Sequence, residues 1–196
     1  MALENLIYDR TEGDAERWLY LSRKLDTEGW AELTAAEKRE WLTQLKGAYN
    51  YTDMNRVGSA VEYLGERFTS LITHLIEYRA LYGVANDPLF RVPYTAADVD
   101  IDPKTDWTIG DNVWAERAAR YLVDLTVIRG LLPLDADAPS VPSDMVDLTI
   151  GEANDIERLL VVIDEEITVV TARLEEYIRL TAAAWFFSGE LFSGEV

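Results

Sequence analysis

The sequence predicts a mainly α-helical protein: a helical bundle with three long heptad-patterned helices, a short irregular or β segment around 84–109, and an extended aromatic C-terminal tail. Three observations predict this class. Apolar residues recur at alternating spacings of three and four along three stretches of chain, which is the period of one helix face. Prolines gather between those stretches, and four aromatic residues lie within 185–196.

The clearest expected helix spans 53–82. Thr52 or Asp53 is suited to cap its start, and Gly83 follows its last apolar residue, where a terminating glycine belongs. Its apolar stripe follows a heptad repeat without a break. The residues of this stripe are Val57, Val61, Leu64, Phe68, Leu71, Leu75, Tyr78 and Tyr82.

The same pattern returns in two later stretches. The first runs from Trp114 to Leu132, with Asp111 or Asn112 as its cap and Pro133 as its stop. The second runs from Ala153 to Ala184 and is preceded by Thr149 and Glu152, which form a capping box. Its apolar stripe is wide, which favours a bundle with several neighbours over a two-stranded coil.

The remaining chain divides around these helices. Two shorter helices are expected at 11–26 and 34–45, the second with a Thr34–Glu37 capping box and an end at Gly47. Short strands are expected at 90–92 and 98–102, the second because polar and apolar residues alternate there. The expected regions are a helical 1–83, a connector 84–109, a helical 110–184 with a loop at 133–148, and the tail 185–196.

Composition limits the classes of partner. The chain carries 36 acidic and 18 basic residues, a net charge of −18, and its basic residues form no patch, so nucleic-acid binding is not expected. The absence of cysteine removes disulfides and thiolate chemistry and fits a cytosolic origin. Neither a signal peptide nor a membrane-spanning stretch is expected, so the sequence indicates a soluble protein.

Candidate chemical sites are weak. His74 is the only histidine and lacks the partners of a triad or a metal site. Asp98, Asp100, Asp102 and Asp106 begin like a calcium loop, but the glycine and final glutamate of that motif are missing; a looser cation site and a solvated edge remain the alternatives. The sequence therefore predicts no catalytic residue, no metal and no cofactor, and a protein that is not an enzyme.

The tail is the strongest candidate for a binding surface. Two alternatives stay open: it completes the chain's own bundle, or it docks on a neighbouring chain through aromatic anchors. Whether the heptad stripes close within one chain or between chains is likewise open. The residues expected at an interface are Trp185, Phe186, Phe187, Leu191, Phe192, Ile163, Ile167, Val170 and Leu174.

Several phrases of the sequence, taken in order, resemble a family of small structural proteins or C-terminal modules encoded among the tail genes of phages and prophages of Gram-positive bacteria. The phrases span nearly the whole chain. They are 9–11 (Asp-Arg-Thr), 46–50 leading to 53–57 (Asp-Met-Asn-Arg-Val), 61–64, 103–107 (Pro-Lys-Thr-Asp-Trp), 148–149, 152–157 and the closing Ser-Gly-Glu repeats.

The resemblance implies a virion component made in the host cytoplasm, whose partners are other virion proteins. It supplies no catalytic residues. Because Ile and Leu at both core heptad positions favour trimers or higher states, a homo-oligomer is expected. The alternative function is a host-recognition module that binds a cell-surface polymer, with Trp107 and Trp114 as its binding platform.

Overall fold

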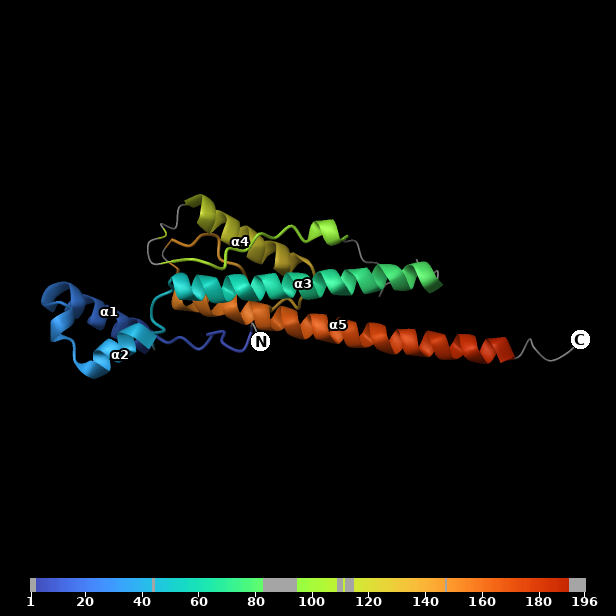
Figure 1. Cartoon of the computed structure of the whole chain (residues 1–196), viewed down its shortest axis with the longest axis horizontal. Helices are drawn as coiled ribbons and strands as arrows, with labels where there is room; N and C mark the ends of the chain where they lie inside the picture. The colour runs from blue at the N-terminus through green and yellow to red at the C-terminus, as the bar shows by residue number, and fades with distance from the viewer. Residues whose placement is uncertain are drawn as a thin grey trace, which may run out of the picture.

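The computed structural model describes residues 3–43, 45–82, 95–108, 111, 115–146 and 148–190, and only the backbone over 184–190. Within these residues the protein is mainly helical, as expected, and contains no strand (Figure 1). The α-helices are α1 (Glu12–Glu28), α2 (Ala35–Thr43), α3 (Tyr51–Tyr82), α4 (Ala115–Gly130) and α5 (Ile150–Glu190). Two 3-10 turns, η1 (Trp30–Glu32) and η3 (Ala96–Asp98), lie between them.

The bundle is formed by α3, α4 and α5, which all run in the same direction (Figure 1). The contacts between α3 and α5 keep a nearly constant offset in sequence, which only a parallel pair can do. Arg56 binds Glu157, Arg67 binds Asp164 and Tyr78 binds Thr181, at separations of 101, 97 and 103 positions. In a parallel bundle, the chain must go back from the end of one helix to the level where the next one starts. The long segments 83–114 and 131–149 make these connections.

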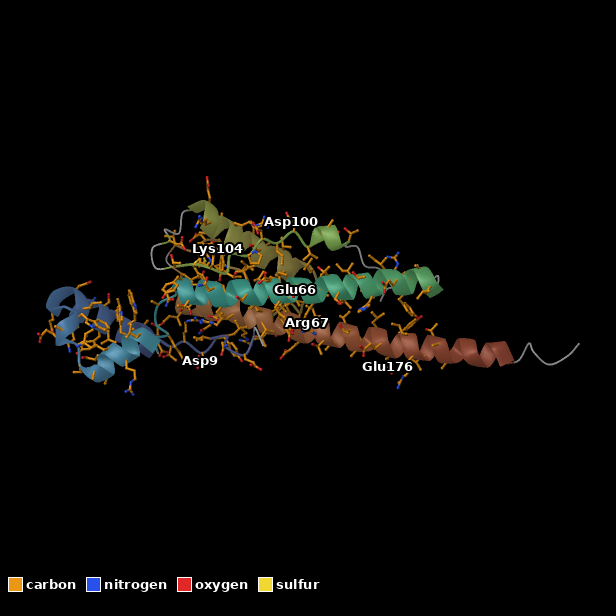
Figure 2. All side chains as sticks on the ribbon, viewed as in Figure 1. Asp9, Glu66, Arg67, Asp100, Lys104 and Glu176 are labelled. Atoms are coloured by element: carbon orange, nitrogen blue, oxygen red, sulfur yellow. The ribbon has the colours of Figure 1, made fainter. Side chains whose placement is uncertain are left out.

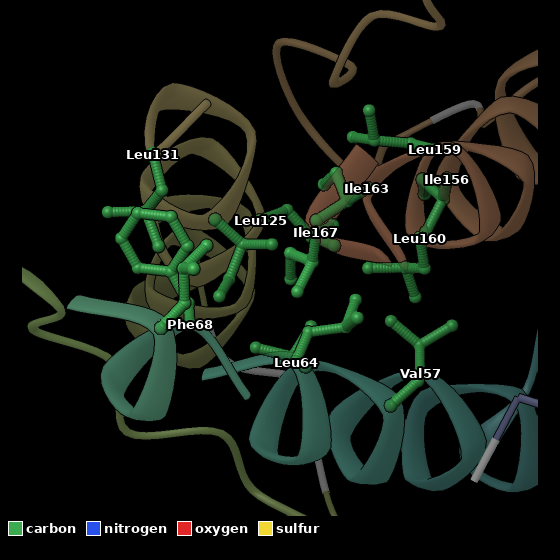
Figure 3. Packing of buried hydrophobic residues seen from close by; sticks show 14 of the residues in the cluster. Val57, Leu64, Phe68, Leu125, Leu131, Ile156, Leu159, Leu160, Ile163 and Ile167 are labelled. Carbon is green, nitrogen blue, oxygen red and sulfur yellow. The ribbon is translucent and has the colours of Figure 1, made fainter. Parts of the chain in front are cut away.

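The core lies where the three helices meet (Figure 3). The expected stripe of α3 is buried from Val57 through Tyr78, and α4 contributes Leu125 and Ile128. From α5 the buried residues include Ile156, Leu159, Leu160, Ile163, Ile167 and Leu174. The wide stripe of α5 is explained by its contacts with both α3 and α4.

Side-chain caps fix the helix starts. The capping boxes of Thr34 with Glu37 and of Thr149 with Glu152 are present as expected. The cap expected for α3, Thr52 or Asp53, is wrong by two or three residues. Asn50 accepts the backbone N–H of Thr52, and the carboxylate of Asp53 accepts the backbone N–H of Asn50, so the helix begins at Tyr51.

The connector differs from the sequence prediction. Residues 90–92 lie outside the described residues, and 98–102 form the end of η3 and irregular chain, where a strand was expected. Val99 and Ile101 do pack against the core, which explains their alternation with polar residues. The N–H of Asp102 donates to the Asp124 carboxylate of α4 at 3.1 Å, whereas a strand would need a backbone partner.

The expected extended tail is also partly wrong. α5 continues to Glu190, so Trp185, Phe186 and Phe187 lie on the last turns of a helix. The only glycine in this added stretch, Gly189, is the next-to-last helical residue, so the sequence up to Ser188 has no strong helix breaker. Leu191 and Phe192 lie outside the described residues.

α1 and α2 form a hairpin at the end of the bundle where α3 begins (Figure 1). Gly47 joins the hairpin to α3. A Cβ at this position would lie 2.0 Å from the carbonyl oxygen of Asp14, so only glycine permits this close approach to α1. The N-terminal segment, residues 3–11, runs beside the first turns of α5 before α1 begins.

Candidate functional site

A buried network of four charged side chains joins the N-terminal segment to α3 and α5. We call Arg10, Asp53, Arg56 and Glu157 the ionic network. Nη2 of Arg10 lies 2.8 Å from Oδ1 of Asp53 and 2.6 Å from Oε1 of Glu157. The Arg10 and Glu157 side chains are 3% and 0% exposed. Since buried charges are costly unless paired, the two positive and two negative groups depend on one another.

Arg56 completes the network from α3. Its Nε and Nη2 donate to the two carboxylate oxygens of Glu157, at 2.9 and 2.8 Å, and Nη2 also binds Asp53. This two-pronged geometry is the strong form of an arginine–carboxylate pair. Burial alone would lower the pKa of Arg56, but its bonds with Glu157 and Asp53 outweigh burial and raise the pKa above its ordinary value.

Side chains of α5 also bind backbone groups of the N-terminal segment. The backbone N–H of Ile7 donates to Glu157. The amide side chain of Asn154 pairs with the backbone of Arg10 in both directions, at 3.0 and 2.9 Å. The N-terminal segment is therefore fixed to α5 by the side chains of Asn154 and Glu157, which lie about one helical turn apart. The role of the ionic network is to hold these segments together.

Two tyrosines extend the network toward α4. The hydroxyl groups of Tyr49 and Tyr121 are hydrogen bonded, and the Arg10 guanidinium lies 5.4 Å from the centre of the Tyr49 ring. Burial raises the pKa of both tyrosines above the ordinary value, so both stay neutral at physiological pH. The pair links the segment just before α3 to the middle of α4.

A second buried junction lies on another face of α3. The Asn55 side chain accepts the backbone N–H of Trp107 at 2.6 Å and donates to its carbonyl oxygen at 2.9 Å. Trp107 is only 4% exposed. It cannot therefore form the binding platform expected for a host-recognition module, and Trp114 lies outside the described residues. Lys104 and Arg117 lie 5.3 and 6.0 Å from the centre of the Trp107 ring.

Sequence reasoning missed the ionic network as a site. Arginine and acidic residues at isolated positions carry no periodic signal, so their burial was not foreseen. One signal was available: Arg10, Asp53, Arg56 and Glu157, together with Asn55 and Trp107, all belong to the phrases on which the family resemblance depends. These sequence segments meet in space at the ionic network and at the contact between Asn55 and Trp107.

The expected interface residues divide into two groups. Ile163, Ile167 and Leu174 are buried and Val170 is partly buried in the chain's own core, so these positions pack within the chain. Any interface on this part of α5 must therefore use its other face. The side chains of Trp185, Phe186 and Phe187 are outside the described residues, as are Leu191 and Phe192.

The residues considered for catalysis or metal binding do not form a common site among the described residues. His74 is exposed and lines a shallow groove beside α3. Asp98 binds the start of η3 through Thr95, which lowers the pKa of Asp98, and Asp106 pairs with Lys104. Among the residues that the structure describes, no cluster of three acidic, histidine or cysteine side chains could hold a metal ion. Figure 2 shows Asp100 and Lys104 on the segment between α3 and α4.

An aromatic groove lies where the hairpin meets the bundle. Its volume is about 1010 Å³, and we call it the junction groove. Trp18 and Trp41 come from the hairpin, and Tyr51 from the first turn of α3. Leu42 also lines it and is 70% exposed. Its charged lining residues are Lys46, which pairs with Asp9, and Arg56 and Asp53 of the ionic network.

The opposite end of the bundle is where α3 ends. There the Tyr78 hydroxyl donates to the Thr181 hydroxyl at 2.8 Å, and the Tyr78 and Tyr177 rings meet edge to face at 5.9 Å. Leu81 and Leu180 remain exposed at this level, Leu81 to 75%. We call the end formed by Leu81, Leu180 and the last turns of α5 the distal end.

The comparisons with known proteins returned no relatives. No protein-family model, no curated protein and no solved structure matches the chain. Across the ranges that the structure describes, none of the helices combines the length and apolar character needed to cross a membrane.

Proposed function

We propose that this chain is a non-enzymatic structural protein of a phage virion, from the tail, baseplate or fibre region, and that it works by protein–protein assembly. Its partners would be other virion proteins and further copies of itself, in a trimer or a higher homo-oligomer. We also propose that the heptad stripes of α3 and α5 pair as a parallel coiled coil, the element that gives the particle component its stiffness.

One observation carries the assembly part of this proposal: large apolar side chains remain exposed at both ends of an elongated bundle. Leu42 and Tyr51 lie at the hairpin end, and Leu81 and Leu180 at the distal end. Exposed apolar groups that cluster at defined places are typical of protein interfaces. The net charge of −18 keeps copies soluble, and single exposed apolar residues such as Val123 and Val169 between the ends form no comparable groups, so we place the contact points at the ends.

The virion setting is supported by the family resemblance. The resembling phrases supply the ionic network and the Asn55–Trp107 junction, which together fix the N-terminal segment and the connector onto α3 and α5. Residues that fix a fold are the ones a structural family needs in common. The resemblance therefore supports a fold shared with that family. The position of the chain within the particle is part of the proposal.

Immunogold labelling of intact phage particles tests this function. An antiserum raised against the purified chain should label particles from the host that encodes it, at one defined place on the tail. The chain should also co-purify with particles through a density gradient. Particles that carry neither label nor chain would overturn the virion proposal.

A further inference from the structure

We infer that the distal aromatic segment of one copy, residues 185–192, docks into the junction groove of a second copy, so that copies associate head to tail. The inference rests on the proposed assembly function and names its partner and its site. Its motivation is the presence of two features at opposite ends of one molecule: a groove lined by aromatic side chains, and a helix end whose sequence carries three consecutive aromatic residues.

Geometry excludes docking within one chain. The junction groove is level with Glu157, because its lining residue Arg56 binds that carboxylate. Glu190 lies 33 residues further along the same helix, about 50 Å away at the helical rise per residue. The last two residues of the segment, 191 and 192, add at most about 7 Å when fully extended. The segment can therefore enter a junction groove only on another copy.

The chemistry of the two surfaces matches. The junction groove is lined by Trp18, Trp41 and Leu42, which suit the rings of Trp185, Phe186 and Phe187. Edge-to-face and stacked aromatic pairs strengthen such contacts beyond the area they bury. An amphipathic helix laid in an apolar groove is a recurrent mode of recognition between proteins.

Charge does not oppose this pairing. The lining residue Lys46 pairs with Asp9, and the lining residues Arg56 and Asp53 belong to the ionic network, so the charged lining of the junction groove is balanced. The segment 185–192 carries one charged residue, Glu190, so its docking buries little charge. The net charge of −18 makes broad side-by-side contacts between copies unfavourable, which favours a small apolar contact. A head-to-tail contact is also heterologous, so it builds chains or rings.

Mixing two interface variants of the full chain tests the inference. The groove variant is Leu42→Glu, chosen because Leu42 is exposed and its replacement leaves the core intact. The segment variant combines Phe186→Glu with Phe187→Glu. The control is Val146→Glu, an exposed apolar residue that lies in the loop before α5 and lines neither surface. Circular dichroism and thermal unfolding show whether each variant folds like the parent.

Light scattering then measures the mass of each sample. The parent and the control should exceed the monomer mass of 22.2 kDa in a concentration-dependent way. Each interface variant alone should be a monomer. Their equimolar mixture should form a dimer and nothing larger, because one copy supplies the intact groove and the other the intact segment.

Two outcomes would overturn the inference. A groove variant that still assembles while the segment variant does not would mean that segments pack against each other. A parent that is monomeric at every concentration would remove self-association, although labelling of virions could still support the proposed function. Labelling that fails while the mixture forms a dimer would overturn the function and leave the head-to-tail contact.

Discussion

Arg10 and Glu157 are 147 positions apart in the sequence, yet Nη2 of Arg10 lies 2.6 Å from Oε1 of Glu157 inside the protein. Glu157 also binds Arg56 of α3 and the backbone of Ile7. One carboxylate thus joins the N-terminal segment and two helices of the bundle. The stability of the whole arrangement should depend on this contact more than on any pair at the surface.

The first prediction concerns the loss of Arg10. Arg10→Leu should lower the free energy of unfolding by about 3–5 kcal/mol, because it leaves the two buried carboxylates of Asp53 and Glu157 with only the Arg56 guanidinium to balance their charge. Urea unfolding measures this change. The matched control is Arg17→Leu, which breaks the Arg17–Glu40 pair at the surface of the hairpin and should cost less than about 1 kcal/mol. Equal losses in the two variants would contradict a structural role for the ionic network.

The second prediction concerns the paired hydroxyls of Tyr49 and Tyr121. Tyr49→Phe or Tyr121→Phe alone should cost about 1–3 kcal/mol, because each leaves a buried hydroxyl without its partner. The double variant should cost less than the sum of the two single variants, since it leaves neither group unsatisfied. Additive losses in a double-mutant cycle would show that the two hydroxyls do not depend on each other.

The third prediction uses glycines on α3 that the connector approaches closely. A Cβ at Gly58 would lie 2.4 Å from the carbonyl oxygen of Lys104, which is backbone and cannot easily move. Gly58→Ala should therefore destabilise by about 1–3 kcal/mol. Gly65→Ala should cost less, because the atom it meets is the mobile end of Ile101.

Gly151→Ala is the control for these glycine variants. No atom lies closer than 3.9 Å to a Cβ at that position on α5, so it should be neutral or slightly stabilising through helix propensity. Thermal unfolding of the three variants checks the order. A Gly58→Ala protein as stable as the parent would mean that the connector does not pack on α3 as described.

The fourth prediction concerns acid. Hydrogen bonds from the Thr34 backbone, from Lys24 and from the Thr34 hydroxyl lower the pKa of Glu37 from 4.5 to about 2. Because the folded pKa lies below the unfolded one, this group stabilises the hairpin above pH 4.5, and that stabilisation is lost as the pH falls toward 2. Helical signal from the hairpin, followed by NMR, should fall across this window.

Glu37→Gln provides the comparison. It removes the titrating group, so the variant should be less stable at neutral pH and should show a weaker dependence on pH between 4.5 and 2. The resonances of Thr34 and Lys24 report on this directly. An unchanged acid profile in the variant would show that another carboxylate governs the stability of the hairpin.

Much of the fold could be predicted from the sequence because periodicity and caps are local signals. The stripe from Val57 to Tyr78 identified α3, and the Thr34 and Thr149 capping boxes marked the starts of α2 and α5. The parallel direction of α3, α4 and α5 was not foreseen. The long connections 83–114 and 131–149 were the signal for it, since antiparallel neighbours need only short ones.

The errors have physical reasons as well. The segment 98–102 alternates like a strand because Val99 and Ile101 face the core, and alternation alone does not reveal whether a partner strand exists. The tail was expected to be extended because glycines disfavour helix, but the stretch from Trp185 to Ser188 lacks them and continues α5. The ionic network was missed because pairing between distant charges leaves no local pattern.

We propose that this chain assembles through its ends. The most direct test is the solution mass of the full chain beside a version that ends at Ala184, both measured by light scattering over a range of concentrations. We expect the full chain to form a multimer and the shortened chain to be a monomer of unchanged fold. Two monomers, or two multimers of the same number of copies, would contradict the account.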